Sequence, residues 1–481
     1  MILIKQAQIV DGSGKKPFRG DILINGQKIS AINSVIKKKA DKIIDGLGLI
    51  AAPGFIDVNT DSDHYLSLFT NPSQKDFISQ GVTTIIGGQC GSSLAPLMYG
   101  SLAGVSEWTN SEVNVDWRGL KEFFKIIQKI KLGIRFETLV GHSTIKRDLV
   151  GDTPRDLTDS ELQVFSKILE DALKSDALGL STGLGHAYEN TASYYEIKTL
   201  VNIVARYNKV YATHLRNEKE NLLKSINETL AIARETGAKT IISHFRPIRG
   251  FEKEFEESLN LIEKGLGETN VYFDVNPFEI SLIPIYSMLP YWAQDATIQK
   301  MLEFLDNEIT REKIVQEMAK IELGDLVVDS AAGHDYLVGK NLEEIAKNTG
   351  KNPIDSLFEL MKITKFRVMF FSKNLDSRLI INMLFHPRSL IGSNSASLPQ
   401  ENKKFDFERA TLTFPRFLEI AAGHNMPIEE TIKKITSFPA KIYGLKNRGI
   451  IKEGLAADIT LLKDQKIAGV ILNGKQVLTN G

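Results

Sequence analysis

Strand-like and helix-like patterns alternate from about residue 50 to about residue 440, and this alternation restricts the fold more than any other feature. Short apolar runs rich in β-branched residues are separated by segments with helical spacing, such as Leu120–Ile130 and Asp159–Leu173. Repeated βα units predict a parallel sheet with right-handed crossovers. Eight strands would close a barrel, so one of nine candidates belongs elsewhere. The candidates are Ile50–Val58, Val82–Gly87, Arg135–Gly141, Ala177–Ser181, Val210–His214, Thr240–His244, Val271–Val275, Arg367–Phe371 and Ser389–Gly392.

The two ends of the chain show short strand patterns and turns, with no βα alternation. Asn25-Gly26, for example, is a strong hairpin signal. Neither end is long enough to be stable alone, so we expect residues 1–50 and 440–481 to form one small β-sandwich domain. Residues 51–439 would form the barrel. Within it, the Leu-rich and mainly helical stretch 283–344 interrupts the alternation and predicts an inserted subdomain or lid.

Composition argues against several classes of partner. The 481 residues include 59 basic and 59 acidic ones, which gives no indication of nucleic acid or of an anionic membrane as a partner. No apolar run reaches the roughly 18 residues that span a bilayer, and the first residues turn polar too soon for a signal peptide. The single cysteine excludes an internal disulfide and fits a reducing compartment. We therefore expect a cytoplasmic protein.

Polar or reactive side chains occur where five of the predicted strands end. They are Cys90, His142, His214, His244 and Asn394. In barrels of this type the active site lies at the C-terminal ends of the strands. One thiolate and two imidazoles are a suitable ligand set for zinc, with a fourth position left for water. The alternative is a buried cysteine beside two hydrogen-bonded core histidines.

Several short motifs extend over nearly the whole chain. They are Ala-Pro-Gly-Phe-Ile-Asp (52–57), Gly-Val-Thr-Thr (81–84), Cys-Gly-Ser-Ser-Leu-Ala-Pro (90–96), Gly-Leu-Ser-Thr-Gly-Leu (179–184), Tyr-Ala-Thr-His-Leu-Arg-Asn-Glu (211–218), Ile-Ser-His (242–244), Thr-Phe-Pro-Arg (413–416), Thr-Ser-Phe-Pro-Ala (436–440) and Gly-Leu-Ala-Ala-Asp-Ile (454–459). With these motifs the sequence resembles the amidohydrolase superfamily and, within it, the D-aminoacylase (N-acyl-D-amino-acid deacylase) group. The resemblance implies a distorted (β/α)₈ TIM barrel of the amidohydrolase type.

The resemblance also implies roles for individual residues. The ligands of the tighter metal fall on Cys90, His214 and His244, so we expect one zinc ion per chain. The arginine assigned to the substrate carboxylate falls on Arg409, and a family basic residue falls on Arg246. An arginine binds a carboxylate through two parallel hydrogen bonds. For both arginines the alternative is a surface ion pair.

The sequence departs from the family pattern where a second metal and a general base are expected. Asn59-Thr60-Asp61 stands in place of a His-x-His pair, and Asn394 in place of a catalytic aspartate. An asparagine amide cannot take a proton from water. An engineered aspartate-to-asparagine change at 394 would not account for the two missing histidines. Asp61 is a candidate substitute as ligand or base, unless it only belongs to a polar loop that caps the next helix. His142 would either polarise a carbonyl or bridge loops.

Two functions therefore remain open on the sequence alone. One is a single-zinc hydrolase of amide C–N bonds that acts, with low activity, on an N-acyl amino acid anchored by Arg409. The other is a non-catalytic relative that binds a small carboxylate ligand or a partner in the old pocket. The missing His-x-His pair and aspartate favour the second function. The complete set Cys90, His214 and His244 favours the first, because a purely structural descendant has no chemical need for it.

Overall fold

The computed structural model describes residues 1–102, 105, 109, 111–151, 153, 155–186, 189–265, 267–294, 296–318, 326–331, 333–399 and 408–479. Within these ranges, no helix combines the length and the apolar character that a membrane crossing requires. Part of the predicted lid at 283–344 lies outside the described residues.

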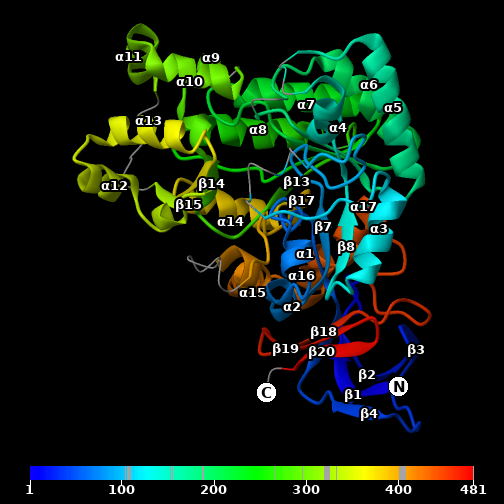
Figure 1. Ribbon diagram of the computed structural model, residues 1–481. Helices are drawn as coiled ribbons and strands as arrows, with labels where there is room; N and C mark the ends of the chain where they lie inside the picture. The colour runs from blue at the N-terminus through cyan, green and yellow to red at the C-terminus, as the bar shows by residue number, and fades with distance from the viewer. Residues whose placement is uncertain are drawn as a thin grey trace.

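Parallel strands form the centre of the molecule (Figure 1). Six of them pair in the order β17-β13-β12-β11-β10-β9, and three pair in the order β6-β7-β8. Only Leu139 separates β8 from β9, so these two short strands continue one another and join the two sheets. On the other side, a parallel bridge links Thr60 after β6 to Ser395 after β17. The strands are β6 (Phe55–Asp57), β7 (Val82–Gly87), β8 (Arg135–Thr138), β9 (Val140–Gly141), β10 (Gly179–Gly183), β11 (Val210–His214), β12 (Lys239–Ile242), β13 (Val271–Val275) and β17 (Ser389–Ile391).

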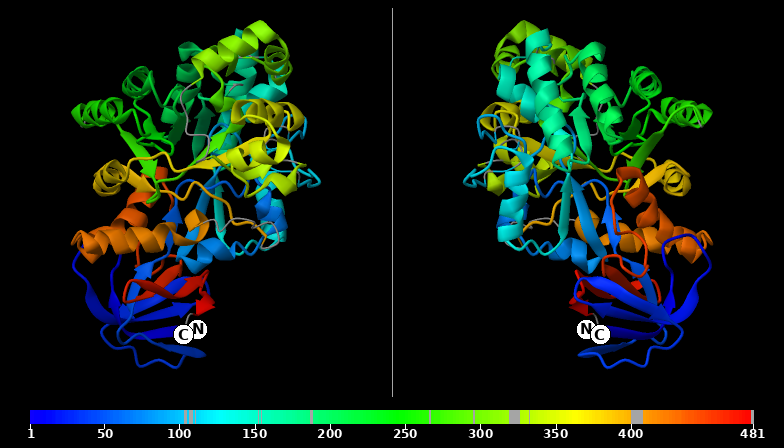
Figure 2. Two further views of the ribbon diagram at one scale, coloured as in Figure 1. Left: turned by 90° about the vertical axis from the view of Figure 1, so that its left-hand side faces the viewer. Right: turned by 90° about the vertical axis from the view of Figure 1, so that its right-hand side faces the viewer.

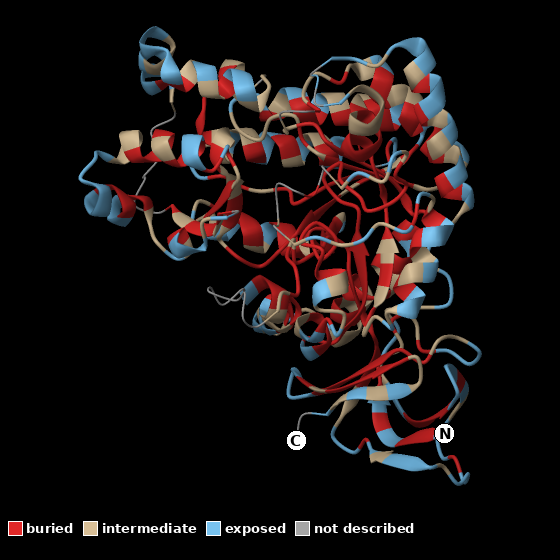
Figure 3. Cartoon of the chain, viewed as in Figure 1, coloured by how far each residue is buried: buried red, intermediate tan, exposed pale blue. Residues whose placement is uncertain are grey.

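Amphipathic helices pack around these strands and turn their polar faces outward (Figure 3). In α5, for example, Leu162, Phe165 and Leu169 recur at helical spacing and are buried. Thr158 begins this helix through a capping box, in which its hydroxyl accepts from the Glu161 amide while the Glu161 carboxylate accepts from the Thr158 amide. The helices are α3 (Leu120–Lys129), α4 (His142–Val150), α5 (Asp159–Lys174), α6 (Tyr194–Arg206), α7 (Leu222–Thr236), α8 (Glu252–Lys264), α14 (Ser377–Phe385), α15 (Glu408–Gly423), α16 (Ile428–Ile435) and α17 (Ser437–Tyr443).

Both ends of the chain contribute strands to one separate sheet, which lies at one end of the molecule (Figure 2). Its order is β20-β19-β18-β5-β1-β2-β3, with β4 beside β1. The side chain of Arg135, at the start of β8, bonds Asp458 at 2.7 Å and so ties this sheet to the central strands. The strands are β1 (Ile2–Ile9), β2 (Phe18–Asn25), β3 (Lys28–Asn33), β4 (Lys42–Asp45), β5 (Ile50–Pro53), β18 (Ile459–Lys463), β19 (Lys466–Leu472) and β20 (Lys475–Thr479).

One expected strand, Ile50–Val58, is two strands. Its first half is β5 in the terminal sheet, and its second half is β6 in the central one. The break falls at Gly54, where a Cβ atom would lie only 2.1 Å from Oγ1 of Thr83. A single apolar run hides this crossing between sheets, because burial is similar in both.

The one strand candidate that lies outside the parallel strands is Arg367–Phe371. It corresponds to β16, which pairs antiparallel with β14 and β15. A second hydrophobic cluster accompanies this sheet and extends from Ile285 to Phe370, beyond the expected limit at residue 344. The region therefore contains strands as well as helices. Its elements are β14 (Ser281–Pro284), α9 (Tyr291–Gln294), α10 (Ile298–Asp306), α11 (Glu308–Glu317), β15 (Val327–Ala331), α12 (Leu342–Thr349), α13 (Pro353–Ile363) and β16 (Val368–Ser372).

Candidate metal centre

The C-terminal ends of three parallel strands bring the predicted ligands together. Cys90 follows β7, His214 ends β11 and His244 follows β12. Cys90 and His244 have positive φ angles of 49° and 37°, as does Asn394 after β17 at 47°. Left-handed backbone is uncommon for residues other than glycine, and it concentrates at functional sites. Left-handed backbone at these three residues lets the chain turn sharply as soon as each strand ends.

The ligand atoms of these three residues form one cluster. One such atom from each of Cys90, His214 and His244 lies within 4.8 Å of the other two. Sγ of Cys90 lies 3.2 Å from Nε2 of His244. Zinc binds sulfur at about 2.3 Å and nitrogen at about 2.0 Å, which places two tetrahedral ligand atoms roughly 3.5 Å apart. Nδ1 of His214 is buried and has no hydrogen-bond partner among the described residues. This donor set fits a zinc ion.

A carboxylate whose side chain is 12% exposed, that of Glu218, lies beside both histidines. Its oxygens are 3.7 Å from Nε2 of His214 and 3.6 Å from Nδ1 of His244. Arg246 holds the same carboxylate, with Nε donating at 3.2 Å and one terminal nitrogen forming an ion pair with it. Burial alone would raise the pKa of Glu218, but the charges of Arg246 and the histidines hold it well below its ordinary value. Glu218 therefore stays ionised in contact with the candidate ligands.

The Cys90 thiol is the ligand that most needs a cation. Burial raises its pKa well above the ordinary value, and the nearby charges of Asp61 and Asp274 raise it further. Only a thiolate binds zinc strongly, and a bound metal deprotonates a coordinating thiol. In the protein alone the thiol is therefore protonated, so zinc binding at this position would release a proton.

The side of the site built from β6 and β17 has a different character. Nδ2 of Asn59 donates to both carboxylate oxygens of Asp274, at 3.3 and 3.2 Å. The backbone amide of Asn394 donates to the carbonyl of Asn59 at 2.8 Å. Burial raises the pKa of Asp274 to about 6, although the positive charge of His244 lowers it. Here a neutral amide engages the carboxylate that faces the site.

The polar loop after β6 is fully enclosed. Oδ2 of Asp63 accepts from the backbone amide of Gly88 at 2.6 Å, and Nδ1 of His64 lies 3.4 Å from Oδ1 of Asp61. Burial would lower the pKa of His64, but Asp63 and Asp61 raise it to about 9. His64 is thus a cation that pairs with Asp61, whose side chain is only 6% exposed. Asp61 is more than a surface helix cap.

Arg409 enters the same region from the first turn of α15 and is buried. Burial lowers the pKa of its guanidinium, whereas the negative charges of Asp61 and Asp329 raise it. Asp329 comes from β15 of the inserted region. The guanidinium of Arg409 thus interacts with carboxylates from two separate segments, and Arg246 is engaged by Glu218.

His142 lies in a buried ion network next to the metal cluster. Its Nδ1 is 3.1 Å from Glu189 and its Nε2 is 2.8 Å from Glu196, which also binds Lys146 at 3.0 Å. Burial opposes the imidazolium form, but the two carboxylates raise the pKa of His142. With both nitrogens engaged, this imidazole bridges segments. This geometry favours a bridging role for His142 over a role in which the imidazole polarises a carbonyl.

Four residues near the centre were not among the sequence-based candidates. His186 has its ring centroid 4.7 Å from that of His214. Glu218 ends the Tyr-Ala-Thr-His-Leu-Arg-Asn-Glu motif, and Asp274 is a lone charge inside an apolar strand. Both residues could therefore have been identified as candidates from the sequence. Glu189 had none, because its position depends on contacts between distant segments.

Comparison with known proteins places this geometry in context. A sequence profile described as the amidohydrolase family matches residues 376–477. The D-aminoacylase of Alcaligenes xylosoxydans xylosoxydans is 26% identical over 475 residues, which cover 97% of this chain and 89% of that protein. The N-acyl-D-glutamate deacylase of Bordetella bronchiseptica, solved with zinc and a phosphonate inhibitor, is 24% identical with a TM-score of 0.81 over 99% of this chain and 96% of that one.

A solved D-aminoacylase with a binuclear metal centre is similar at the same level, with 25% identity and a TM-score of 0.81 over 100% of this chain and 96% of that one. These comparisons confirm the resemblance to the amidohydrolase superfamily and its D-aminoacylase group. The fold is mixed α/β and of the amidohydrolase type.

Proposed function

We propose that this chain is a metal-dependent hydrolase of amide C–N bonds that acts on N-acyl amino acids. The observation that carries the proposal is the cluster of ligand atoms from Cys90, His214 and His244, all within 4.8 Å of one another. Relatives that align over nearly the whole chain are a D-aminoacylase and an N-acyl-D-aspartate deacylase. We infer one zinc ion per chain at this cluster. A zinc ion supplies Lewis-acid chemistry, which activates water and polarises an amide carbonyl.

Residues around the cluster would keep the ligands in place. Glu218 lies 3.6 Å from Nδ1 of His244, whose Nε2 faces Cys90. A carboxylate on the far nitrogen fixes the tautomer of a metal-binding histidine and raises its basicity. Arg246 in turn holds Glu218, so its role is to position this carboxylate. That contact makes Arg246 a poorer candidate for direct substrate binding.

Proton transfer would be the weak step of the reaction. Asn394 stands where the family places a general base and cannot accept a proton. Asp61 is the candidate substitute, because it is buried near Arg409 and pairs with His64. General-base catalysis typically contributes about 10²–10⁴-fold. Low activity is therefore expected unless Asp61 performs this task.

Arg409 is the proposed anchor for the substrate carboxylate. Its guanidinium already interacts with Asp61 and Asp329. A substrate carboxylate would compete with these two groups, so binding would be accompanied by a rearrangement or by protonation of one of them. Burial raises the pKa of Asp329 to about 7, which makes its protonation accessible near neutral pH.

We also infer the closed form of the central sheet. The strand order and the bridge from Thr60 to Ser395 support a distorted (β/α)₈ barrel that closes between β6 and β17. Residues 1–50 and 440–481 would then form the small β domain and 51–439 the barrel. The inserted subdomain would begin near 283 and reach past 344, because its hydrophobic cluster includes Phe370.

A non-catalytic function remains the second candidate, and Asn59 is the observation that favours it. Its side-chain amide donates hydrogen bonds to both oxygens of the Asp274 carboxylate, which is then engaged within the protein. The proposed pocket would then bind a small carboxylate ligand without hydrolysing it.

The deciding test uses zinc-loaded protein and a panel of N-acetyl and N-formyl D- and L-amino acids. We expect release of the free amino acid from at least one D-substrate above the rate of metal-free protein. Background rates across the panel, with zinc confirmed by elemental analysis, would reject the hydrolase for these substrates. Saturable binding of the same compounds by calorimetry would then support the non-catalytic function.

A further inference from the structure

A cavity lies at the N-terminal ends of the parallel strands, away from the candidate metal centre. Its volume is about 350 Å³, at the lower end of the range for small-molecule sites. It is formed where α6 leads into β11, where α7 leads into β12 and where β13 begins, and α17 closes it. The lining includes Asn208, Lys209, Lys239, Asn270, Tyr272, Phe438 and Lys441.

Three lysines line this cavity, and none of the described residues that line it is acidic. Lys239 pairs in register with Val210, directly after Lys209, so the two lysines start neighbouring strands. Nζ of Lys239 donates to the carbonyl of Ile442 at 3.1 Å, at the end of α17. This carbonyl compensates one of the three charges only in part, since it carries no net charge.

The charged groups around the lysines do not fully neutralise the positive charge at the cavity. Partial burial lowers the pKa of Lys209 and of Lys239, and the charge of Lys209 lowers that of Lys239 further. Outside the cavity, Asp176 and Glu137 attract Lys209, and Lys446 repels it. An anion inside the cavity would relieve the repulsion between the two lysines.

The other wall of the cavity is aromatic. Tyr272 and Phe438 meet edge to face with ring centroids 6.0 Å apart. The guanidinium of Arg388 lies 5.1 Å from the Tyr272 ring centroid, so that ring is already supported by a cation. Lysines on one wall and aromatic rings on the other suit a ligand with a charged end and a planar end.

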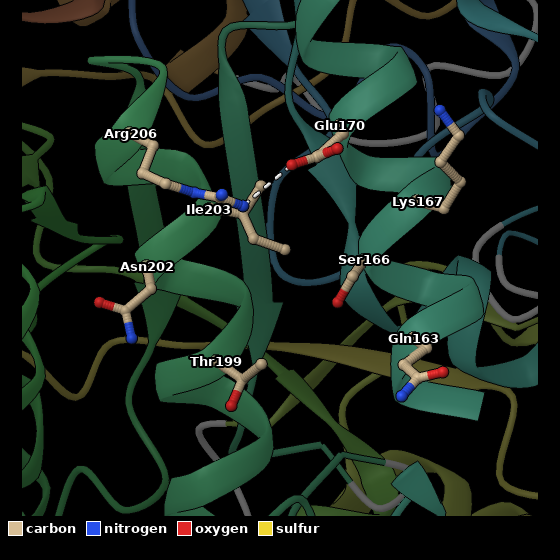
Figure 4. Close-up of a pocket in the computed structure, with 8 residues that line it drawn as sticks. All are labelled: Gln163, Ser166, Lys167, Glu170, Thr199, Asn202, Ile203 and Arg206. Atoms are coloured by element: carbon tan, nitrogen blue, oxygen red, sulfur yellow. Dashed lines mark hydrogen bonds and ion pairs between the residues drawn. The ribbon is translucent and has the colours of Figure 1, made fainter. Parts of the chain in front are cut away.

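The groove between α5 and α6 shows how a merely solvated cationic surface differs (Figure 4). It also contains a lysine and an arginine. There, however, Arg206 pairs with Glu170 at 2.9 Å and Lys167 pairs with Asp171 at 3.0 Å. Both of these groove cations form close ion pairs, whereas the two carboxylates that attract Lys209, Asp176 and Glu137, lie outside the lining of the 350 Å³ cavity.

We propose that the cavity formed by Lys209, Lys239, Lys441, Tyr272 and Phe438 binds a small aromatic phosphate monoester. The lysines would contact the dianionic phosphate, for which lysine acts as a point charge. The two aromatic side chains would contact the ring. This site would be distinct from the metal centre, because it lies at the N-terminal rather than the C-terminal ends of β11, β12 and β13.

The test is calorimetric titration of the zinc-loaded full chain with phenyl phosphate at low ionic strength. We expect a Kd below about 1 mM. Inorganic phosphate, which lacks the ring, should bind about tenfold more weakly, and phenol should not bind detectably. Lys209→Gln combined with Lys239→Gln should weaken phenyl phosphate binding about tenfold or more. Lys167→Gln, in the α5/α6 groove, is the matched control and should leave the Kd unchanged.

Two outcomes would overturn the proposal. Equal affinity in wild type and in the double variant would place any bound phosphate elsewhere, including at the metal centre. Equal affinity for inorganic phosphate and phenyl phosphate would remove the role of the aromatic wall. If the double variant does not fold, the exposed Lys441→Gln variant replaces it, with a several-fold loss expected. An unchanged Kd in that variant would count against the site in the same way.

Discussion

The two halves of the candidate site differ in what they have kept. The half built on β7, β11 and β12 holds Cys90, His214 and His244 close enough to share one metal ion. The half built on β6 and β17 holds Asn59 and Asn394, two neutral amides where charged or basic groups would be needed for a second metal. Metal binding and proton transfer are separate questions for this chain, since one half gathers the candidate ligands and the other lacks the base that the family pattern predicts.

Each half is backed by a carboxylate, buried in the case of Asp274 and 12% exposed in the case of Glu218, and the two carboxylates have different partners. Glu218 lies beside two imidazoles and is held by Arg246. Asp274 accepts two hydrogen bonds from the amide of Asn59. An ionised carboxylate strengthens a neighbouring histidine as a ligand. The same kind of group in the other half only satisfies an amide, so a buried carboxylate alone does not make a metal site.

Removal of a ligand from the intact half should have the largest effect. Cys90→Ala leaves two imidazoles, and we expect zinc affinity to fall by more than the ~10–100-fold typical of residues that only support a ligand. Elemental analysis after dialysis should give less than about 0.2 zinc per chain, against about one for wild type. His424→Asn, an exposed histidine away from the cluster, is the control. Unchanged zinc content in Cys90→Ala would reject the three-ligand site.

Restoration of a carboxylate in the altered half should have the next largest effect. Asn394→Asp places a base at the strand end beside the metal cluster, and hydrolysis of N-acyl amino acids should rise about 10²-fold. The control is Asn425→Asp, because Asn425 also has left-handed backbone, with φ of 58°, but lies at an exposed helix end. Background rates in both variants, with zinc bound, would indicate that the altered half has lost the substrate geometry as well as the base.

Much of this arrangement follows from local sequence. The parallel strands are apolar runs long enough to recognise, and strand ends in such folds meet at one edge. The clustering of the three candidate ligands could therefore be predicted from the sequence. The break at Gly54 and the antiparallel position of β16 could not, because they depend on which distant segment each run contacts, and periodicity does not encode that.

The neighbours of the ligands were harder to anticipate. Glu218 lies four residues after His214 and in reach of it, yet its contact with His244 crosses from one loop to another. The engagement of Arg246 by Glu218 gives this arginine a partner within the protein, whereas the sequence offered it as a candidate for binding the substrate carboxylate. Such competition between partners is decided by packing, since several oppositely charged groups are equally compatible with the sequence.

A smaller effect is expected from the carboxylate behind the intact half. Glu218→Gln keeps the shape but removes the charge that lies 3.6 Å from Nδ1 of His244, and zinc affinity should fall about 10–100-fold. Competition with a fluorescent chelator would measure it. Glu228→Gln is a matched control, because Glu228 also pairs with a partly buried arginine, Arg216, at 2.8 Å. If the two variants bind zinc equally well, Glu218 has no part in the metal site.

The smallest effect should come from a single nitrogen ligand returned to the altered half. In Asn59→His the new imidazole would still face the neutral Asn394, and an amide oxygen is a much weaker zinc ligand than a carboxylate. The zinc content should therefore stay near one per chain. The comparison variant adds Asp61→His and Asn394→Asp and should approach two metals, about 3.5–4 Å apart as in two-metal sites.

Asn59 is fully buried, with its Cβ close to Gly392, so both variants need a check of folding by circular dichroism. Two zinc ions in Asn59→His alone would mean that Asp61 or Asp274 already acts as a ligand. The contrast between the halves would then rest on the base at position 394 and not on the metal ligands.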